Sequence, residues 1–283
     1  MLRAHDYGPV HYFSLARSRF GRTILTSGVY FVDGLLIDTG PANAQLQLAR
    51  VLGRVRPDQV VLTHHHEDHI GNALFVANHI DRPPLAHPLA LPLVRRPGPL
   101  PLYRRITWGT PQPFAAEALG KRLATPSHRF EVIHTPGHAP DHIALYEPEQ
   151  RWLFAGDLFI AAHVKVLRAD ENVSGLIASL RKLLELPDCT LFCQHTGMHS
   201  SHHKSFGRKL DFLLSTQRKA VALRADGRSV AEIAAALDIR NRWIEVFSRG
   251  EFSGRNLIAE LLRDAEAASQ TPPAGDDGAA GRS

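Results

Sequence analysis

The sequence has few of the features that mark exported, disulfide-stapled or membrane-embedded proteins. Only two of its 283 residues are cysteines, Cys189 and Cys193. On the strand expected there they would lie about 13 Å apart, which is too far for a disulfide, so we expect both to be packing residues. No apolar run reaches the ~18 residues that a bilayer span needs, and Arg3, His5 and Asp6 interrupt any leader-like apolar core. These absences exclude a disulfide miniprotein and a membrane protein, and they predict a cytoplasmic location.

The length and the charge distribution predict two folding units and one unusual segment. At about 150 residues per domain, 283 residues suggest two units. Residues 79–126 carry seven basic and two acidic side chains, which is the whole net charge of +5, together with ten of the nineteen prolines. Such a stretch inside a folded unit is typical of a functional loop, and a solvated surface insertion is the alternative. We therefore interpret 79–126 as a lid or insert.

Hydrophobic periodicity predicts an alternation of strands and helices over most of the chain. The Asp33-Gly34 pair indicates a hairpin within 29–37. A helix is expected over 42–55, with an apolar face formed by four residues: Leu46, Leu48, Ala49 and Leu52. The remaining strands are expected at 59–63, 130–134, 143–146, 152–155 and 190–193, and the remaining helices at 70–78 and 173–186.

The C-terminal part changes character and is predicted to be helical. A long amphipathic helix is expected over 204–225, and Ser229 with Glu232 forms a capping box that opens the next helix. Two more helices are expected at 241–248 and 256–267. We therefore divide the chain into a catalytic domain over 1–203, a helical region over 204–268 and a disordered tail over 269–283, where apolar side chains are scarce.

The most informative segment is the histidine-rich run over 63–72, Thr-His-His-His-Glu-Asp-His-Ile-Gly-Asn, which follows a predicted strand. On such a loop His64 and His66 can turn to one side and bind one cation, while Asp68 and His69 reach a second position. Imidazole and carboxylate ligands favour zinc, with iron and manganese as the alternatives. The loop alone cannot close either site. We expect the missing ligands at the ends of three other strands: His138, Asp157 and His195.

Several neighbouring polar residues are expected to lie outside the ligand set. By the alternation that turns His64 and His66 inward, His65 and Glu67 should point away. His142 is expected either to line the pocket or to lie on the surface. His199 competes with His195 for the last position, and we favour His195 because it directly follows a predicted strand.

These segments resemble the sequence blocks of the metallo-β-lactamase superfamily. Residues 63–72 resemble its T-H-x-H-x-D-H-x-G-N signature. The other blocks follow in the same order: Asp38, Thr135-Pro-Gly-His138, Phe154-Ala-Gly-Asp157 and His195. The resemblance covers about residues 13–199. It implies an α/β fold, an αββα sandwich of two face-to-face sheets, to which the C-terminal helices are a small appendage.

The resemblance also implies how the ligands divide between two metal ions. The first ion would take three histidines: His64, His66 and His138. The second ion would take three other ligands, and a carboxylate would bridge the two ions: Asp68, His69 and His195, bridged by Asp157. Asp38 corresponds to a carboxylate that braces the ligand loop in this family, although Gln194 stands before His195 where the family commonly has glycine.

The implied activity is metal-dependent hydrolysis. Two cations that share a water lower its pKa from 15.7 to near ~7 and give a hydroxide nucleophile, and Asp68 is the candidate for carrying a proton to the leaving group. The Thr-Pro-Gly-His block is most similar to the glyoxalase II and lactonase members, which favours an ester, thioester or lactone of a small anionic or acyl compound. Five leucines of the 79–126 segment would cover the acyl chain: Leu89, Leu91, Leu93, Leu100 and Leu102. Lys165 is a weaker candidate for contacting a substrate carboxylate or oxyanion.

Three alternatives to this hypothesis of carbonyl hydrolysis are kept. A phosphodiesterase or ribonuclease of the same fold is favoured by the arginine-rich 79–126 segment and by 229–247, which resembles a helix-turn-helix. A mononuclear iron thiol or persulfide dioxygenase would keep similar ligands, whereas flavodiiron oxygen reductases place Glu where this chain has His66. A non-enzymatic nucleic-acid-binding module would leave seven ligand positions unexplained.

Overall fold

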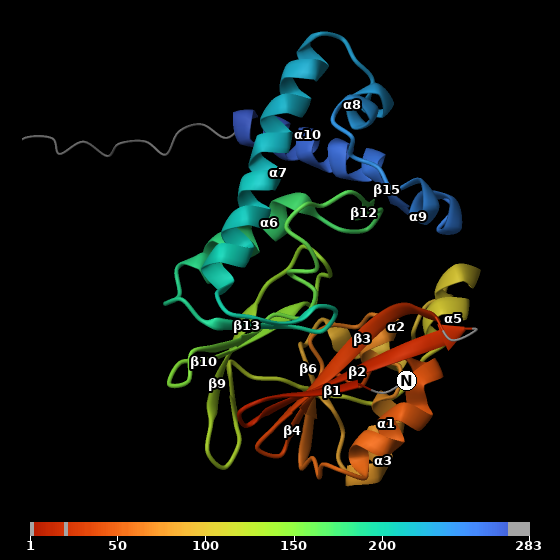
Figure 1. Ribbon diagram of the computed structural model, residues 1–283, viewed down its shortest axis with the longest axis vertical. Helices are drawn as coiled ribbons and strands as arrows, with labels where there is room; N and C mark the ends of the chain where they lie inside the picture. Colours follow the sequence, from red (N-terminus) through yellow and green to blue (C-terminus); the bar gives the residue numbers. More distant parts are fainter. Residues whose placement is uncertain (1–2, 20–21, 271–283) are drawn as a thin grey trace, which may run out of the picture. The chain divides into compact units, whose positions relative to one another are not determined.

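The computed structural model describes residues 3–19 and 22–270, and these form two compact units (Figure 1). Of the described residues, the first unit contains those up to 163 and those from 170 to 212, and the second contains 164–169 and 213–270. Most of the predicted tail, 271–283, lies outside the described residues, whereas 269–270 belong to the last helix. Among the described residues no helix is both long and apolar enough to cross a membrane.

The first sheet of the first unit contains seven described strands, which lie side by side in chain order. The first four strands pair antiparallel and the last four pair parallel. The predicted hairpin is present, because Asp33 and Gly34 both adopt the left-handed φ values, 47° and 82°, that a tight turn needs. The strands are β1 (Arg3–Tyr7), β2 (Val10–Arg19), β3 (Arg22–Val32), β4 (Leu35–Ile37), β5 (Gln59–Val61), β6 (Leu85–Ala86) and β7 (Glu117–Ala118).

The second sheet contains six described strands in the order β14-β13-β11-β10-β9-β8. Only β11 and β13 pair in parallel, and helix α6 (Val173–Leu184) lies between them in the chain, as a parallel connection requires. The strands are β8 (Arg122–Ala124), β9 (Arg129–His134), β10 (Ile143–Glu147), β11 (Trp152–Phe154), β13 (Thr190–Cys193) and β14 (Gly197–His199).

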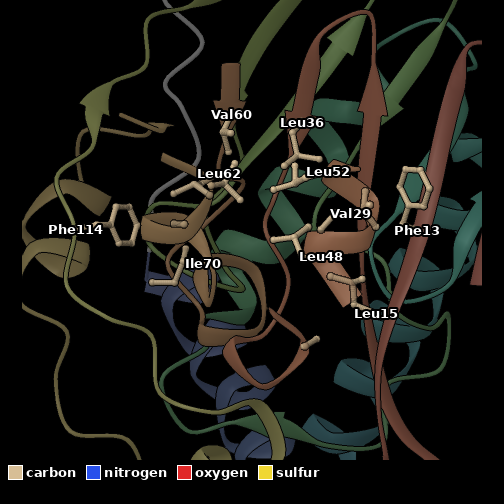
Figure 2. Packing of buried hydrophobic residues seen from close by; sticks show 14 of the residues in the cluster. Phe13, Leu15, Val29, Leu36, Leu48, Leu52, Val60, Leu62, Ile70 and Phe114 are labelled. Carbon is tan, nitrogen blue, oxygen red and sulfur yellow. The ribbon is translucent and has the colours of Figure 1, made fainter. Parts of the chain in front are cut away.

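One face of the first sheet packs against helices, as Figure 2 shows. The short helix η1 (Ala42–Ala44) leads into α1 (Gln45–Leu52), and α2 (Glu67–Ile70) leads into α3 (Ala73–Ile80). Leu48 and Leu52 of α1 meet Val29 in this core. The predictions for Leu46 and Ala49 are wrong. Both residues are exposed, Leu46 at 81%, because they lie about 200° and about 100° around the helix from Leu48.

The other face of the first sheet packs against the second sheet. Alternation along the strands turns Tyr30 and Ile37 into this layer, where they meet Phe154 and Phe192. The ring of Tyr30 lies edge-on to both phenylalanines, at 5.4 Å between centroids. Helix α6 binds the end of β9, since Lys182 Nζ donates to the carbonyl of His134 at 3.0 Å. The predicted α/β sandwich with two sheets between helices is therefore confirmed.

The 79–126 segment is partly a structural element of the first unit. Besides β6, β7 and β8 it forms α4 (Ala90–Arg95) and α5 (Leu102–Trp108), and Val94 and Phe114 are buried in the first core. Of the leucines expected to cover an acyl chain, Leu91 packs against that core. Three others have side chains 36–64% exposed: Leu89, Leu93 and Leu102.

The second unit is mainly helical. The capping box forms as predicted, because Ser229 Oγ accepts from the Glu232 backbone N–H and Glu232 Oε2 accepts from the Ser229 N–H. The division lies after Phe212, inside α7, rather than at 203/204, and residues 164–169 join this unit because their strand β12 pairs with β15. The elements are α7 (His202–Ala225), α8 (Val230–Ala236), α9 (Arg242–Phe247), α10 (Gly254–Gln270), β12 (Leu167–Arg168) and β15 (Phe252–Ser253).

Candidate metal centre

The seven side chains predicted as metal ligands lie together in two adjoining groups. Within each group one donor atom per residue lies within 4.8 Å of all the others. Asp157 lies between the groups, because its Oδ2 is 3.0 Å from His195 Nε2 and 3.4 Å from His138 Nε2. The first group consists of His64, His66 and His138, and the second of Asp68, His69, Asp157 and His195.

The fold brings these residues together because they follow strand ends. His64 and His66 follow β5, and Asp68 and His69 lie on the short helix α2 behind them. The other ligands come from the second sheet: His138 from the β9–β10 loop, Asp157 after β11 and His195 after β13. Functional groups gather in this way at the carboxyl ends of strands in other α/β proteins.

Most of the histidine rings are held through Nδ1, which leaves Nε2 for the site. His69 Nδ1 lies 2.8 Å from Asp38 Oδ2, and His195 Nδ1 lies 2.6 Å from the carbonyl oxygen of Thr26. His64 Nδ1 lies 3.0 Å from the Thr63 hydroxyl. Such partners fix the tautomer in which Nε2 carries the lone pair that a metal ion needs.

Four of the atoms that face the centre have no hydrogen-bond partner among the described residues. They are buried, and unpaired buried polar atoms are rare because they are costly. A divalent cation would satisfy all of them, so the residues present fit the implied metal ions. The atoms are Nε2 of His64, His69 and His138 and Oδ1 of Asp157.

Asp38 braces the second group from behind. Its buried carboxylate accepts hydrogen bonds from the Thr63 backbone N–H, from His69 Nδ1 and from Gln194 Nε2, each at 2.8 Å. Gln194 therefore takes up the space that a glycine at this position would leave, and it connects the end of β13 to the end of β4.

His142, expected to line the pocket or lie on the surface, does neither. It is fully buried; its Nδ1 donates to Thr135 Oγ1 at 2.8 Å, and its Nε2 accepts from the Asp157 backbone N–H at 3.1 Å. Burial, with the neighbouring His138, lowers the pKa of His142 to about 3, so its ring is neutral. Gly156 allows this approach: a Cβ there would lie 2.5 Å from His142 Nε2, and φ is 47°.

Two buried tyrosines hold the backbone that leads to His195. Tyr12 donates to the carbonyl of Gln194 at 2.9 Å, and Tyr30 donates to the carbonyl of Cys193 at 2.7 Å. The Gly28 backbone N–H donates to the same Gln194 carbonyl at 2.7 Å. These contacts join strands of both sheets at the site, and no local sequence pattern indicates them.

The two ligand groups differ in electrostatics. Burial and the neighbouring His69 hold the pKa of His64 well below its usual value, so the His64 ring of the first group is neutral. In the second group burial also disfavours a charged imidazole and lowers the pKa values of His69 and His195. The negative charges of Asp157 and Asp68 have the larger effect and raise both pKa values well above the ordinary value. The same contacts hold the pKa of Asp157 well below its usual range against the effect of burial.

The residues expected to lie outside the ligand set have other partners. His65 Nδ1 lies 2.6 Å from Asp141 Oδ1, and Glu67 pairs with Arg104. His199 Nε2 lies 2.8 Å from the Thr196 hydroxyl.

Lys165 lies in the second unit, where its Nζ is 2.8 Å from Asp238 Oδ2, and its substrate role stays a prediction. Glu171, which sequence reasoning missed, has its Oε1 3.5 Å from His138 Nδ1. A lone glutamate before a helix gives no signal of this contact.

Comparison with known proteins agrees with this geometry. The family model described as the metallo-beta-lactamase superfamily matches residues 27–195. Hydroxyacylglutathione hydrolase of Stenotrophomonas maltophilia (strain R551-3) is 31% identical over 214 residues, which cover 72% of this chain and 74% of that protein.

Two solved structures extend the comparison. A metallo-beta-lactamase family protein of Thermus thermophilus, TTHA1429, has a TM-score of 0.66 at 21% identity and covers 93% of both chains, so it shares the fold. The structure of TTHA1623 in a di-iron-bound form has a TM-score of 0.50 at 28% identity, covering 66% of this chain and 92% of that one. With the family model matching more than half of its length, the chain belongs to the metallo-beta-lactamase superfamily.

Proposed function

We propose that the protein is a hydrolase that uses two divalent metal ions to cleave an ester, thioester or lactone carbonyl. The observation that carries the proposal is the position of Asp157 between two groups of donor atoms, three of whose imidazole nitrogens are buried without a hydrogen-bond partner in the described part of the chain. The similarity to a hydroxyacylglutathione hydrolase supports a thioester as the first substrate class to test.

The first group would hold one ion and the second group the other, with Asp157 shared. Zinc suits this set of nitrogen and carboxylate ligands, and the di-iron form of TTHA1623 makes iron the main alternative, with manganese next. When bound, two such ions polarise a carbonyl and lower the pKa of a water toward neutrality.

Asp68 is the residue to which we assign proton transfer. Its Oδ2 lies 3.3 Å from His195 Nε2, and its side chain is 10% exposed, so the carboxylate faces the centre but keeps some access. Ser27 Oγ donates to the Asp68 carbonyl at 2.9 Å and fixes the backbone there. A carboxylate in this position can accept a proton from the attacking water and donate it to the leaving group.

The test is turnover by zinc-, iron- and manganese-loaded protein on matched substrates. The panel contains a thioester and a lactone, a phosphodiester and a short RNA, and a persulfide with oxygen uptake as the readout. Cleavage of the carbonyl compounds supports the proposal. Activity confined to the phosphodiester or RNA would overturn it in favour of a nuclease, and oxygen uptake confined to the iron form would overturn it in favour of a dioxygenase.

The role of Asp68 is tested by Asp68→Asn and Asp68→Ala, with Asp33→Asn as a control far from the ligand set. We expect both Asp68 variants to lose at least 100-fold in kcat, the lower end of what general acid–base catalysis contributes. Metal content is measured on the same samples. Retention of most activity with both ions bound would contradict the assignment.

A further inference from the structure

Helix α5 brings the 79–126 segment to the candidate metal centre. Trp108, the last residue of α5, has its ring centroid 6.4 Å from that of His195, with 55° between the ring planes. Trp108 is half-buried, so part of its surface is accessible to solvent. A large apolar surface at this position is not needed to hold a metal ion.

An ion pair fixes α5 to the ligand loop, residues 63–72, which carries four of the candidate metal ligands. Arg104 Nε donates to Glu67 Oε1 at 2.6 Å, and Arg104 Nη2 donates to Glu67 Oε2. Glu67 is 3% exposed and directly precedes Asp68. A bidentate pair of this kind sets orientation as well as distance. At the other end of the helix Asn43 Nδ2 donates to the carbonyl of Thr107 at 2.6 Å.

The helical spacing places the indole on the anchored side of α5. Arg104 and Trp108 are four residues apart and share one face of the helix. Leu102 and Ile106 occupy the opposite face and are 64% and 44% exposed. The ion pair that holds the helix to the ligand loop therefore also directs Trp108 toward the centre.

We propose that α5 is the specificity wall of the active site and that Trp108 packs against an apolar acyl chain of the substrate. This inference rests on the proposed function and names its substrate class. The polar part of the substrate would meet the ligand groups, which are all imidazole or carboxylate, so the chain that continues from the carbonyl meets the indole. The open side of the ring then determines which acyl groups are accommodated.

The proposal predicts a dependence on acyl length that the indole controls. Each methylene packed against an apolar surface should raise kcat/KM about two- to fourfold. In acyl thioesters of two to eight carbons with one common thiol, kcat/KM of the wild type should rise with length, mainly through KM. Trp108→Ala should flatten that slope, and Trp108→Phe should restore part of it. Trp243→Ala, which removes a tryptophan 59% exposed on α9 of the second unit, is the matched control.

A binding experiment separates this proposal from the proposed function. Acetate and octanoate are titrated by calorimetry into the zinc-loaded protein, which requires no turnover. We expect octanoate to bind at least tenfold more tightly than acetate to the wild type and to Trp243→Ala, and the difference to fall below threefold in Trp108→Ala.

The assignment of α5 as the specificity wall would be overturned if Trp108→Ala kept the wild-type preference for octanoate over acetate. It would also be overturned if the wild type showed no such preference. Both conclusions hold whatever the enzyme hydrolyses. If the preference for octanoate changes as expected while no carbonyl substrate is cleaved, the role of α5 in acyl binding is supported and the proposed reaction is contradicted. Arg104→Met should also weaken the preference, and Arg104→Lys should recover part of it. Metal content must stay at the wild-type level for that comparison.

Discussion

Replacing Asp38 by asparagine tests the network behind the second ligand group. Asp38 is fully buried and has φ = 63°, which asparagine tolerates well, so the backbone should be retained. One oxygen can still accept from the Thr63 N–H. The new NH₂ group would face His69 Nδ1 and Gln194 Nε2, which both donate to the native carboxylate. Two charge-assisted hydrogen bonds are lost and two donors are brought together.

The expected loss follows from these contacts. Each hydrogen bond to a charged group contributes about 1.5–3 kcal/mol, so the metal-free variant should lose about 3–6 kcal/mol of unfolding free energy. That is a large part of the 5–15 kcal/mol typical of a domain, as order-of-magnitude values. Because His69 also loses the partner that fixes its tautomer, metal affinity should fall about 10- to 100-fold.

Zinc affinity would be measured by competition with a chromophoric chelator, and stability by urea unfolding of the metal-free protein. Asp33→Asn is the matched control: Asp33 also has a positive φ, 47°, and its carboxylate accepts from Thr125 Oγ1 and the Ser127 N–H at 2.6 Å, away from the ligand groups. The control should keep wild-type metal affinity. If Asp38→Asn also bound both ions as tightly as the wild type, the bracing role of Asp38 would be refuted.

Three further predictions concern stability. In Gly28→Ala the new Cβ would lie 2.0 Å from the buried ring of Tyr12, so urea unfolding should show a loss of at least ~1–3 kcal/mol, whereas Gly120→Ala, with nothing within 4 Å, should stay close to wild type. Burial raises the pKa of Tyr12 from 10.0 to about 12. The folded chain therefore keeps a proton that the unfolded chain loses, and unfolding free energy should fall by about 1.4 kcal/mol per pH unit between pH 10 and 12. Urea titrations should show a shallower fall in Tyr12→Phe, and an equal slope would argue against a buried neutral phenol. Removal of metal by a chelator should lower Tm, and readdition of zinc at 100 times Kd should restore about 2.7 kcal/mol; a Tm independent of zinc would contradict binding at this centre.

The clustering of the candidate ligands was predictable because they follow strands that the sequence itself marks. Short apolar strands precede His64, His138, Asp157 and His195, and strand ends of a sandwich meet at a common edge. The turn at Asp33-Gly34 was predictable for a local reason too, since few residue pairs adopt two successive left-handed conformations.

The supporting contacts were not predictable, because they join residues far apart in sequence. Glu67 and Arg104 each look like ordinary surface charges, and only the folded chain pairs them. Glu171 beside His138 gives no periodic or motif signal. The error at Leu46 has a different origin: Leu48, Val51 and Leu52 follow the three- and four-residue spacing of one helix face, and Leu46 is apolar but does not share that spacing.

The hydrogen bond from Gln194 to Asp38 has a consequence for the order of events during synthesis. It joins residues separated by 156 positions, and the second ligand group likewise needs His195 together with His69. Contacts of such long range form late, because a long loop must close before they are made. A nascent chain that ends before β13 carries Asp68, His69 and Asp157 but lacks His195, so its second group is incomplete. Retention of two ions would thus report that the chain has been made at least as far as His195 and that the sandwich has closed.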